Sequence, residues 1–390
     1  MKRVLIFSLA YHPHVGGAEV AIKEITDRIP DLEFHIITHR FERALPAEER
    51  LGNVVVHRVG FGSSYLSKIL FVPWAAFAAA RLQKSLRFDA YWAMMSYMLF
   101  PVALLRLAGL RVPYVLTLQE GDPFEHVFGR PHIKLVAPLL SYGFKHARVV
   151  QAISTFLGSW ARERGYQGDL AIIPNAVDIA HFSQRVAPDD IAAVRAQLSL
   201  QAEDRVLITT SRLVKKNAVD VVIRALASLP ENLHFVILGV GHDEVMLRAL
   251  AKECGVERRV HFVGFVDHAG VPRYLAASDI FIRPSRSEGM GNSFVEAMVA
   301  GLPVVATQVG GIADFLFDAR LNPERHATGW VVRPDSPEDI TAAVRNILSN
   351  PAEVEKTVAY ARQFATTHYD WDTIAAAMRE QVFGKALSIG

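Results

Sequence analysis

The sequence predicts an α/β protein built from two doubly wound domains, each a parallel β-sheet with helices on both faces. Short apolar, strand-like runs alternate with helix-length segments along the 390 residues, and this alternation is typical of parallel sheets. The runs form two series of similar length. The chain is also longer than a single hydrophobic core usually supports.

The two series of strand-like runs are separated by a polar, irregular stretch. Strands of the first series are predicted over residues 4–7, 34–38, 54–59, 89–94, 114–118, 148–153 and 170–174. Those of the second series are predicted over residues 205–211, 233–239, 260–265, 279–284 and 303–307. We therefore expect a first domain over residues 1–180, a linker over 181–204, a second domain over 205–365 and a C-terminal helical segment over 366–390.

Composition and charge argue against several classes of protein. The formal net charge of +2 gives no global preference for nucleic acid, and the single cysteine, Cys254, excludes an intrachain disulfide. The N-terminus resembles a secretory signal, but its apolar run, Val4–Ala10, is short and His12-Pro13-His14 interrupts it. We interpret this run as a buried strand. No apolar run reaches the roughly 20 residues of a spanning helix, so we expect a cytoplasmic protein.

The stretch SEGMGNSFVEAMVAGLPVVA, residues 287–306, brings together two glutamates and, between them, two glycines that suit ligand binding. A loop with Gly289 and Gly291 precedes a helix predicted to begin near Ser293, and its N-terminus supplies N–H donors and partial positive charge. Glu288 would lie over a cleft at the strand ends, and Glu296 could accept both hydroxyls of a ribose. The spacing Ser293-x-x-Glu296 also fits a capping box, which is a purely structural alternative.

Three further loops follow predicted strands. Arg212 comes directly after the strand 205–211, with Lys215 and Lys216 close by; cations there suit a diphosphate, and a solvated basic turn is the alternative. Two glycine pairs, Gly16-Gly17 and Gly310-Gly311, also stand just after predicted strands. Their backbone could approach a ligand closely, although an ordinary turn would explain them as well.

These segments together resemble a known family. In order along the chain, HVGGAE, IIPNAVD, SRLVKKN, VGF, RPSRSEGMGNSFVEAMVAGLPVV, VGG and TGWVVRPDSPEDI are similar to motifs of the family-four retaining glycosyltransferases. The resemblance covers nearly the whole chain, and its acid–seven residues–acid element is highly specific. It implies a GT-B fold, in which two Rossmann-like domains face each other and the C-terminal helix returns to the first domain.

The resemblance also implies roles for individual residues. Arg212, Lys216 and Glu288 would be catalytic, with Arg212 and a lysine, Lys215 or Lys216, holding the donor diphosphate and Glu288 lying beside the transferred sugar. The backbone near Gly264 and Phe265 would contact the base of the donor nucleotide, and Glu296 would bind its ribose. The implied donor-binding residues are Gly16, Gly17, Lys215, Gly264, Phe265, Gly289, Met290, Gly291, Asn292 and Glu296.

The chain departs from the family pattern at two places. Counted without a gap, the usual lysine position falls on Asn217, so either Lys215 or Lys216 could meet the phosphate. Many relatives carry a histidine after the strand corresponding to residues 114–118, where this chain has Gln119, Glu120 and Asp122 around Gly121. Any of these three could contact the donor sugar instead.

The implied reaction is a same-face displacement that needs no cofactor and no metal. Asp370-Trp371-Asp372 has the acid–x–acid pattern with which some sugar transferases hold a divalent ion. It precedes a helical segment, however, and we interpret Asp370 or Asp372 as a helix cap and Trp371 as a packing anchor.

The expected partners are a nucleotide-sugar donor and a glycan or lipid-linked acceptor, with no nucleic acid. Residues 58–111 contain seven Lys or Arg against one acid, Asp89, together with several aromatic residues. This composition suits the anionic inner face of a plasma membrane, and an ordinary domain helix with basic flanks is the alternative.

Two other functions fit the same architecture: a sugar-nucleotide-binding protein without catalysis, and a GT-B sugar-nucleotide epimerase. A nicotinamide-dependent oxidoreductase would normally show G-x-G-x-x-G after its first strand, and VGGAEV does not have that spacing.

Overall fold

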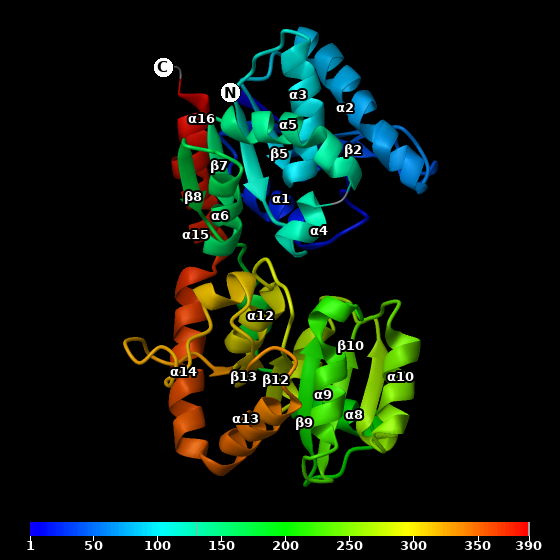
Figure 1. Cartoon of the computed structure of the whole chain (residues 1–390), viewed down its shortest axis with the longest axis vertical. Coiled ribbons are helices and arrows are strands. Elements are labelled where there is room, and N and C mark those ends of the chain that lie inside the picture. Colours follow the sequence, from blue (N-terminus) through cyan, green and yellow to red (C-terminus); the bar gives the residue numbers. More distant parts are fainter. Residues whose placement is uncertain (130, 389–390) are drawn as a thin grey trace. The chain divides into compact units, whose positions relative to one another are not determined.

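The computed structural model describes residues 1–129 and 131–388 and confirms the predicted fold class. The chain forms two compact units, each a β-sheet with helices on both faces (Figure 1). Unit 1 contains Met1–Ala176 and the chain from Trp371 onward, and unit 2 contains Val177–Asp370.

The sheet of unit 1 has eight strands in the order β3-β4-β2-β1-β5-β6-β7-β8. All neighbours are parallel except β3 and β4, which form an antiparallel hairpin at one edge. The strands are β1 (Lys2–Phe7), β2 (Leu32–His39), β3 (Glu48–Leu51), β4 (Val54–Val59), β5 (Ala90–Met94), β6 (Tyr114–Leu118), β7 (Val149–Ala152) and β8 (Asp169–Ile172).

The helices of unit 1 include a C-terminal segment that packs on the N-terminal part of the chain. The helices are α1 (Gly17–Asp27), α2 (Tyr65–Leu86), η1 (Ser96–Met98), α3 (Leu99–Leu107), α4 (Phe124–Phe128), α5 (Pro131–Lys145), α6 (Thr155–Glu163), α15 (Trp371–Ala377), η5 (Met378–Gly384) and α16 (Lys385–Leu387). Phe383 lies edge-on against Trp92 of β5, with ring centroids 5.1 Å apart. The predicted return of the C-terminal segment to the first domain is therefore confirmed.

The sheet of unit 2 is entirely parallel, in the order β11-β10-β9-β12-β13-β14. Its strands are β9 (Arg205–Thr210), β10 (Leu233–Leu238), β11 (Val260–Gly264), β12 (Ile280–Arg283), β13 (Val304–Ala306) and β14 (Trp330–Val331). Its helices are α7 (Ile179–Ser183), α8 (Pro188–Gln197), η2 (Lys215–Asn217), α9 (Val219–Leu226), α10 (Glu244–Glu253), η3 (Glu257–Arg259), α11 (Val271–Ala276), α12 (Asn292–Ala300), η4 (Gly310–Asp314), α13 (Pro337–Ser349) and α14 (Pro351–His368).

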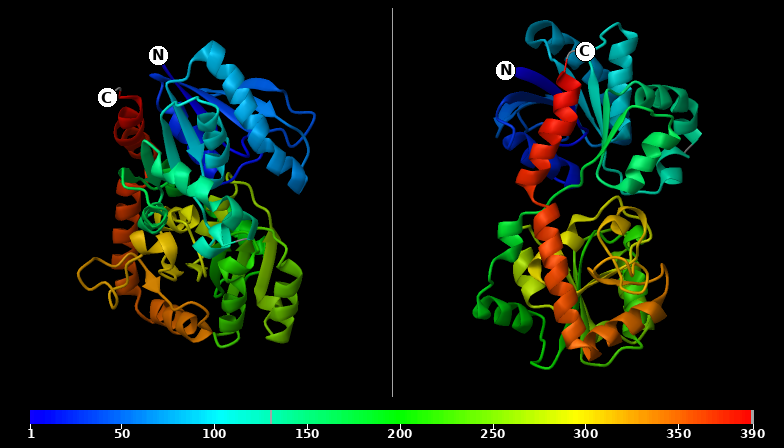
Figure 2. Two further views of the ribbon diagram at one scale, coloured as in Figure 1. Left: turned by 45° about the horizontal axis from the view of Figure 1, so that its top comes forward. Right: turned by 90° about the vertical axis from the view of Figure 1, so that its left-hand side faces the viewer.

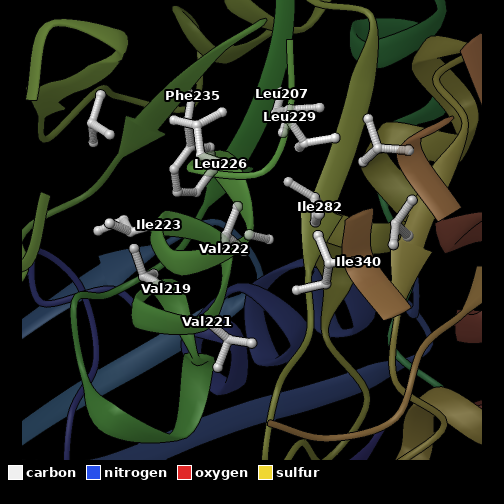
Figure 3. Close-up of a cluster of buried hydrophobic side chains, with 14 of the residues drawn as sticks. Leu207, Val219, Val221, Val222, Ile223, Leu226, Leu229, Phe235, Ile282 and Ile340 are labelled. Atoms are coloured by element: carbon white, nitrogen blue, oxygen red, sulfur yellow. The ribbon is translucent and has the colours of Figure 1, made fainter. Parts of the chain in front are cut away.

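The core of unit 2 lies between its inner strands β9, β10 and β12 and the helices that cover them. Leu207, Phe235 and Ile282 project from three strands toward Val222 of α9 and Ile340 of α13 (Figure 3). All five side chains are buried, and such burial stabilises the folded state by about 1.5–3 kcal/mol for each large aliphatic or aromatic residue.

Two boundary predictions differ from the structure. The segment predicted as a linker, 181–204, is not irregular: it continues α7 and forms α8, and both helices belong to unit 2. The chain also re-enters unit 1 at Trp371 rather than at residue 366, because α14 extends to His368 within unit 2. The short strands β3 and β14 were not predicted.

Candidate functional site

Arg212 follows β9 at the carboxyl end of the unit 2 sheet, with its side chain exposed. Within the described residues no hydrogen bond or ion pair engages its guanidinium. The side-chain amide of Asn217 donates to the Arg212 carbonyl oxygen at 2.7 Å, which folds the η2 turn back beside it. Lys215 is exposed and Lys216 is half-buried on this turn. The structure therefore groups an unengaged arginine with two lysines.

Arg283, the last residue of β12, is a site residue that the sequence analysis missed. Its side chain is buried, and its Nη2 donates to Glu288 Oε2 at 2.8 Å while its Nη1 donates to Ser293 Oγ at 2.9 Å. The guanidinium also lies 4.1 Å from the centre of the Phe294 ring. Burial lowers the pKa of Arg283, and the charges of Glu288 and Glu296 counteract this effect. A buried cation thus fixes the orientation of the Glu288 carboxylate.

Glu296 lies on α12, which begins one residue before the predicted Ser293 and is capped by Gly291. Ser293 makes no capping hydrogen bond and instead accepts from Arg283, so the capping-box alternative is wrong. Burial raises the pKa of Glu296 to about 7, although the charge of Arg283 acts in the opposite direction. The carboxyl group therefore titrates near neutral pH.

Gly291 has a backbone that only glycine adopts easily. Its φ is +89°, and a Cβ there would lie 2.6 Å from the Phe294 ring and 2.7 Å from Arg283 Nη2. The glycine is required because Arg283 and Phe294 pack directly over it.

Arg286 ties the Glu288 loop to the lysine turn, and it too was missed from the sequence. Its guanidinium donates to both carboxylate oxygens of Asp220, at 2.9 and 2.8 Å. Its backbone N–H donates to the Lys216 carbonyl oxygen at 2.7 Å. These bonds hold the basic turn and the acidic loop at a fixed spacing.

The Gly310-Gly311 loop packs on the backbone of Glu288, so a third predicted loop joins the same site. Gly311 N–H donates to the Glu288 carbonyl oxygen at 3.0 Å. A Cβ at Gly310, whose φ is +58°, would lie only 2.0 Å from that oxygen. The glycine pair allows this close approach of two backbones.

The other predicted donor residues of unit 2 differ in what they can offer a ligand. Met290 is only 2 % exposed as a whole residue, so it offers a ligand almost no surface. Gly289 N–H donates to the Glu288 side chain at 3.1 Å, and Asn292 is the first residue of α12. Gly264 ends the edge strand β11, and Phe265 beyond it is 77 % exposed.

Unit 1 carries the predicted glycine loop and the segment after β6. Gly16 caps α1, and its N–H donates to Glu19 Oε2 at 2.8 Å; a Cβ at Gly17 would meet no atom within 4 Å. Gln119 exchanges two amide hydrogen bonds with Asn175, at 3.0 and 3.2 Å.

Glu120 has a structural role in unit 1. It is buried and accepts from the backbone N–H groups of Ser96 and Gln119, at 2.6 and 3.0 Å. Glu120 is therefore engaged in fixing the turn after β5. Asp122, another of the three residues that could replace the family histidine, is half-buried.

Within residues 1–129 and 131–388 no group of three or more His, Cys, Asp or Glu side chains is placed to hold a metal ion. In the Asp370-Trp371-Asp372 segment, Trp371 is buried in the core of unit 1. Asp372 Oδ1 accepts from Arg28 Nε at 2.7 Å.

The groups gathered in unit 2 are of the kinds that suit an anion carrying hydroxyl groups. Arg212 and the lysine turn supply cations, the start of α12 supplies backbone N–H donors, and Glu288 and Glu296 supply acceptors. Anion donors and hydroxyl acceptors thus lie at the carboxyl ends of neighbouring parallel strands, where ligands of open α/β sheets usually bind.

Comparison with protein families gives two matches that together cover most of the chain. The description "Glycosyltransferase Family 4" matches residues 15–181, and "Glycosyl transferases group 1" matches residues 190–364. The second match contains Arg212, the lysine turn, Arg283, Glu288 and Glu296.

Curated relatives match over different shares of the chain. A GDP-mannose-dependent alpha-(1-6)-phosphatidylinositol monomannoside mannosyltransferase of Mycobacterium tuberculosis is 30% identical over 248 residues, 60% of this chain and 62% of the relative. The match therefore spans about three-fifths of that relative's length. An uncharacterised glycosyltransferase of Methanocaldococcus jannaschii is 24% identical over 397 residues, 96% of each chain.

Solved structures share the fold over nearly the full length. A sucrose-phosphate synthase from Thermosynechococcus elongatus superposes with a TM-score of 0.82 at 18% identity, covering 98% of this chain and 100% of that one. The Anabaena protein HepE, in complex with UDP-glucose, gives a TM-score of 0.79 at 22% identity with the same coverage. These likenesses support the GT-B architecture.

Proposed function

Because the chain belongs to the glycosyltransferases of group 1 and family 4, we propose that it moves a hexosyl unit from a nucleoside-diphosphate sugar to a glycan or lipid-linked acceptor, with retention of anomeric configuration. The observation that carries this proposal is the arrangement in unit 2. An unengaged Arg212 stands beside the lysine turn, and Arg283 orients Glu288 at the start of α12.

The relatives support a nucleotide-sugar donor. The mycobacterial relative is named as dependent on GDP-mannose, and the HepE structures contain UDP, UDP-glucose or UDP with glucose. In this chain, Arg212 with Lys216 or Lys215 would neutralise the diphosphate, and Glu296 would accept the ribose hydroxyls. Gly264 and the exposed Phe265 would border the base. The roles of Gly16 and Gly17 remain predictions from the family resemblance.

The proposed reaction follows from where charge develops. The bond between the anomeric carbon and the β-phosphate oxygen breaks, and its electron pair stays on the phosphate. An acceptor hydroxyl oxygen bonds to the anomeric carbon on the same face, and its proton moves to the departing phosphate oxygen. Arg212 and the lysine turn stabilise the phosphate charge as it grows, so they favour the transition state over the ground state. Glu288 positions the sugar.

We further propose that this chemistry needs no metal and no cofactor, and that it takes place in the cytoplasm. Fixed cations and backbone donors provide the stabilisation of the leaving diphosphate that a divalent ion supplies in other transferases. Activity should therefore persist in excess EDTA.

Donor screening and one variant test the proposal. UDP-, GDP- and ADP-sugars are compared by thermal shift, since a bound donor raises the melting temperature, and nucleotide release with product formation is then followed for the best donor. Arg212→Ala should lose about 100-fold in kcat. Arg248→Ala, an exposed arginine paired with Glu244 on α10, serves as the control. Near-normal turnover of Arg212→Ala, or a product of inverted configuration, would refute the mechanism. Donor binding without transfer to any acceptor would instead indicate a binding protein.

A further inference from the structure

The helix α2 in unit 1 has a composition that its place in the fold does not fully explain. Among the described residues it is the one helix long and apolar enough to cross a membrane by length and composition, which differs from the expectation from the sequence because the helix continues through Pro73. One face of α2, including Phe71, Ala75 and Ala79, is buried and packs near β2, β4 and α3. Figures 1 and 2 show the helix on the outside of this unit. It is therefore an integral layer of unit 1 with a second, uncovered face.

That uncovered face carries an apolar patch. Leu66, Leu70 and Phe77, spaced along one side of α2, are 63, 39 and 74 % exposed. Of the 17 exposed large hydrophobic side chains in the described chain, six lie between residues 61 and 77, so the patch is concentrated here. The apolar patch comprises Phe61, Tyr65, Leu66, Ile69, Leu70 and Phe77. A contiguous exposed apolar surface usually marks an interaction site.

The same face becomes basic toward the C-terminus of α2. Arg81 and Lys84 continue the helical spacing of Phe77, and Arg87 follows the helix end; all three are exposed. Within the described residues none of these three cations forms an ion pair. The sequence contains no acidic residue between Glu49 and Asp89. The patch is therefore bordered by positive charge that no acidic group of the neighbouring sequence offsets.

We propose that unit 1 docks on an anionic lipid bilayer through the uncovered face of α2. The aromatic and aliphatic side chains would enter the headgroup boundary, while Arg81, Lys84 and Arg87 meet anionic headgroups, the combination that characterises interfacial helices. A protein partner or a second copy of the chain would need a matching acidic rim, and the charge favours the bilayer. The docking is independent of sugar transfer, because it involves no residue of the unit 2 site.

Vesicle flotation of the full chain, without donor or acceptor, tests the docking. Vesicles of phosphatidylcholine alone are compared with vesicles containing roughly one-third phosphatidylglycerol, at low and high salt. We expect binding to the anionic vesicles only, weakened at high salt. The double variant Arg81→Ser/Lys84→Ser should lower the partition coefficient about 30-fold, since each cation near such a surface contributes about fivefold. The double variant Leu70→Ser/Phe77→Ser should abolish flotation.

Matched controls come from unit 2, on the exposed surfaces of α9 and α10. Arg224→Ser/Lys252→Ser removes two exposed cations, and Val245→Ser/Met246→Ser removes two exposed apolar side chains; both should float like the unchanged protein. Equal binding to neutral and anionic vesicles, or no loss in either α2 variant, would overturn the proposal. The proposal would also be overturned if Leu70→Ser/Phe77→Ser changed the protein from a dimer to a monomer and left flotation unaltered. In that case a second copy of the chain, and not a bilayer, would cover the face.

Discussion

Arg283 Nη2 lies 2.8 Å from Glu288 Oε2, so a buried cation at the end of β12 holds the first glutamate of the acid–seven residues–acid element. The same guanidinium stacks on Phe294 of α12 and lies in the field of Glu296, the second glutamate. One arginine therefore contacts the first acid and acts on the second through its charge.

Arg283→Met should lower kcat by about 100-fold or more while changing the donor KM less. Removing one partner of a buried ion pair leaves the other unpaired, at a cost of roughly 3–5 kcal/mol, and Glu288 would leave its position beside the sugar. Arg283→Lys keeps the charge but not the two-way geometry, and should recover part of kcat. Steady-state kinetics measure the separate changes in kcat and in the donor KM, and circular dichroism checks that each variant is folded. Wild-type kcat in folded Arg283→Met would exclude a positioning role.

Glu296→Gln should stabilise the protein at alkaline pH. Since burial raises the pKa of Glu296 to about 7 from an ordinary 4.5, the folded state holds a proton that the unfolded state releases. The stability from this group is therefore present below pH 4.5 and is lost as pH rises through about 7. The melting temperature of the variant, relative to the unchanged protein, should increase by several degrees between pH 5 and pH 8.

The same titration should appear in donor binding. The ionised Glu296 carboxylate accepts ribose hydroxyls better than the acid, so donor affinity should rise by up to roughly tenfold per pH unit below 7. Calorimetric titration at pH 6 and pH 8 measures this change, which should vanish in Glu296→Gln. A pH dependence that persists in the variant would assign it to another group.

Arg286→Gln should raise the donor KM severalfold with a small effect on stability. The partly exposed pair with Asp220 contributes about 1 kcal/mol or less to folding. Its loss leaves the backbone bond between Arg286 N–H and the Lys216 carbonyl oxygen without the support of the side chain, so the lysine turn is held less firmly beside the Glu288 loop. Arg248→Gln removes a comparable pair on α10 and should leave KM unchanged. Kinetics that respond equally to both variants would contradict a specific role for Arg286.

Gly310→Ala and Gly255→Ala form a matched pair for the backbone contact on Glu288. Both glycines have positive φ, +58° and +71°, and alanine costs about 1–2 kcal/mol in either. Only at Gly310 would the new Cβ approach the Glu288 carbonyl oxygen, at 2.0 Å. We expect kcat/KM to fall at least tenfold in Gly310→Ala alone. Equal activities at equal melting temperatures would show that the Glu288 backbone tolerates displacement.

Much of the fold could be predicted because its central strands are continuous apolar runs. The strand β3 could not be predicted because its sequence, EERL, is charged. It forms at an exposed edge of the sheet by antiparallel pairing with β4. β14 has only two residues, too few for any periodic pattern. The helix α8, PDDIAAVRAQ, exposes most of its surface, so no apolar stripe distinguished it from a linker.

The loops of the candidate site could be predicted from glycines and charges placed after strands, but their mutual contacts could not. Arg283 reads as part of an apolar strand, and its pairing with Glu288 and Ser293 depends on how the loop folds back. Arg286 reaches Asp220, which is 66 residues away in sequence. Such contacts come from tertiary packing, which local patterns do not encode.

The return of the chain to unit 1 at Trp371 has a consequence for folding during synthesis. Phe383 fills the core beside Phe34 and Trp92, so this core cannot close until the segment after Asp370 has left the ribosome. Unit 2 is continuous in sequence and can fold earlier. The half of the protein that is translated first is thus the last to be completed, and until then its sheet exposes apolar side chains that the C-terminal segment later covers.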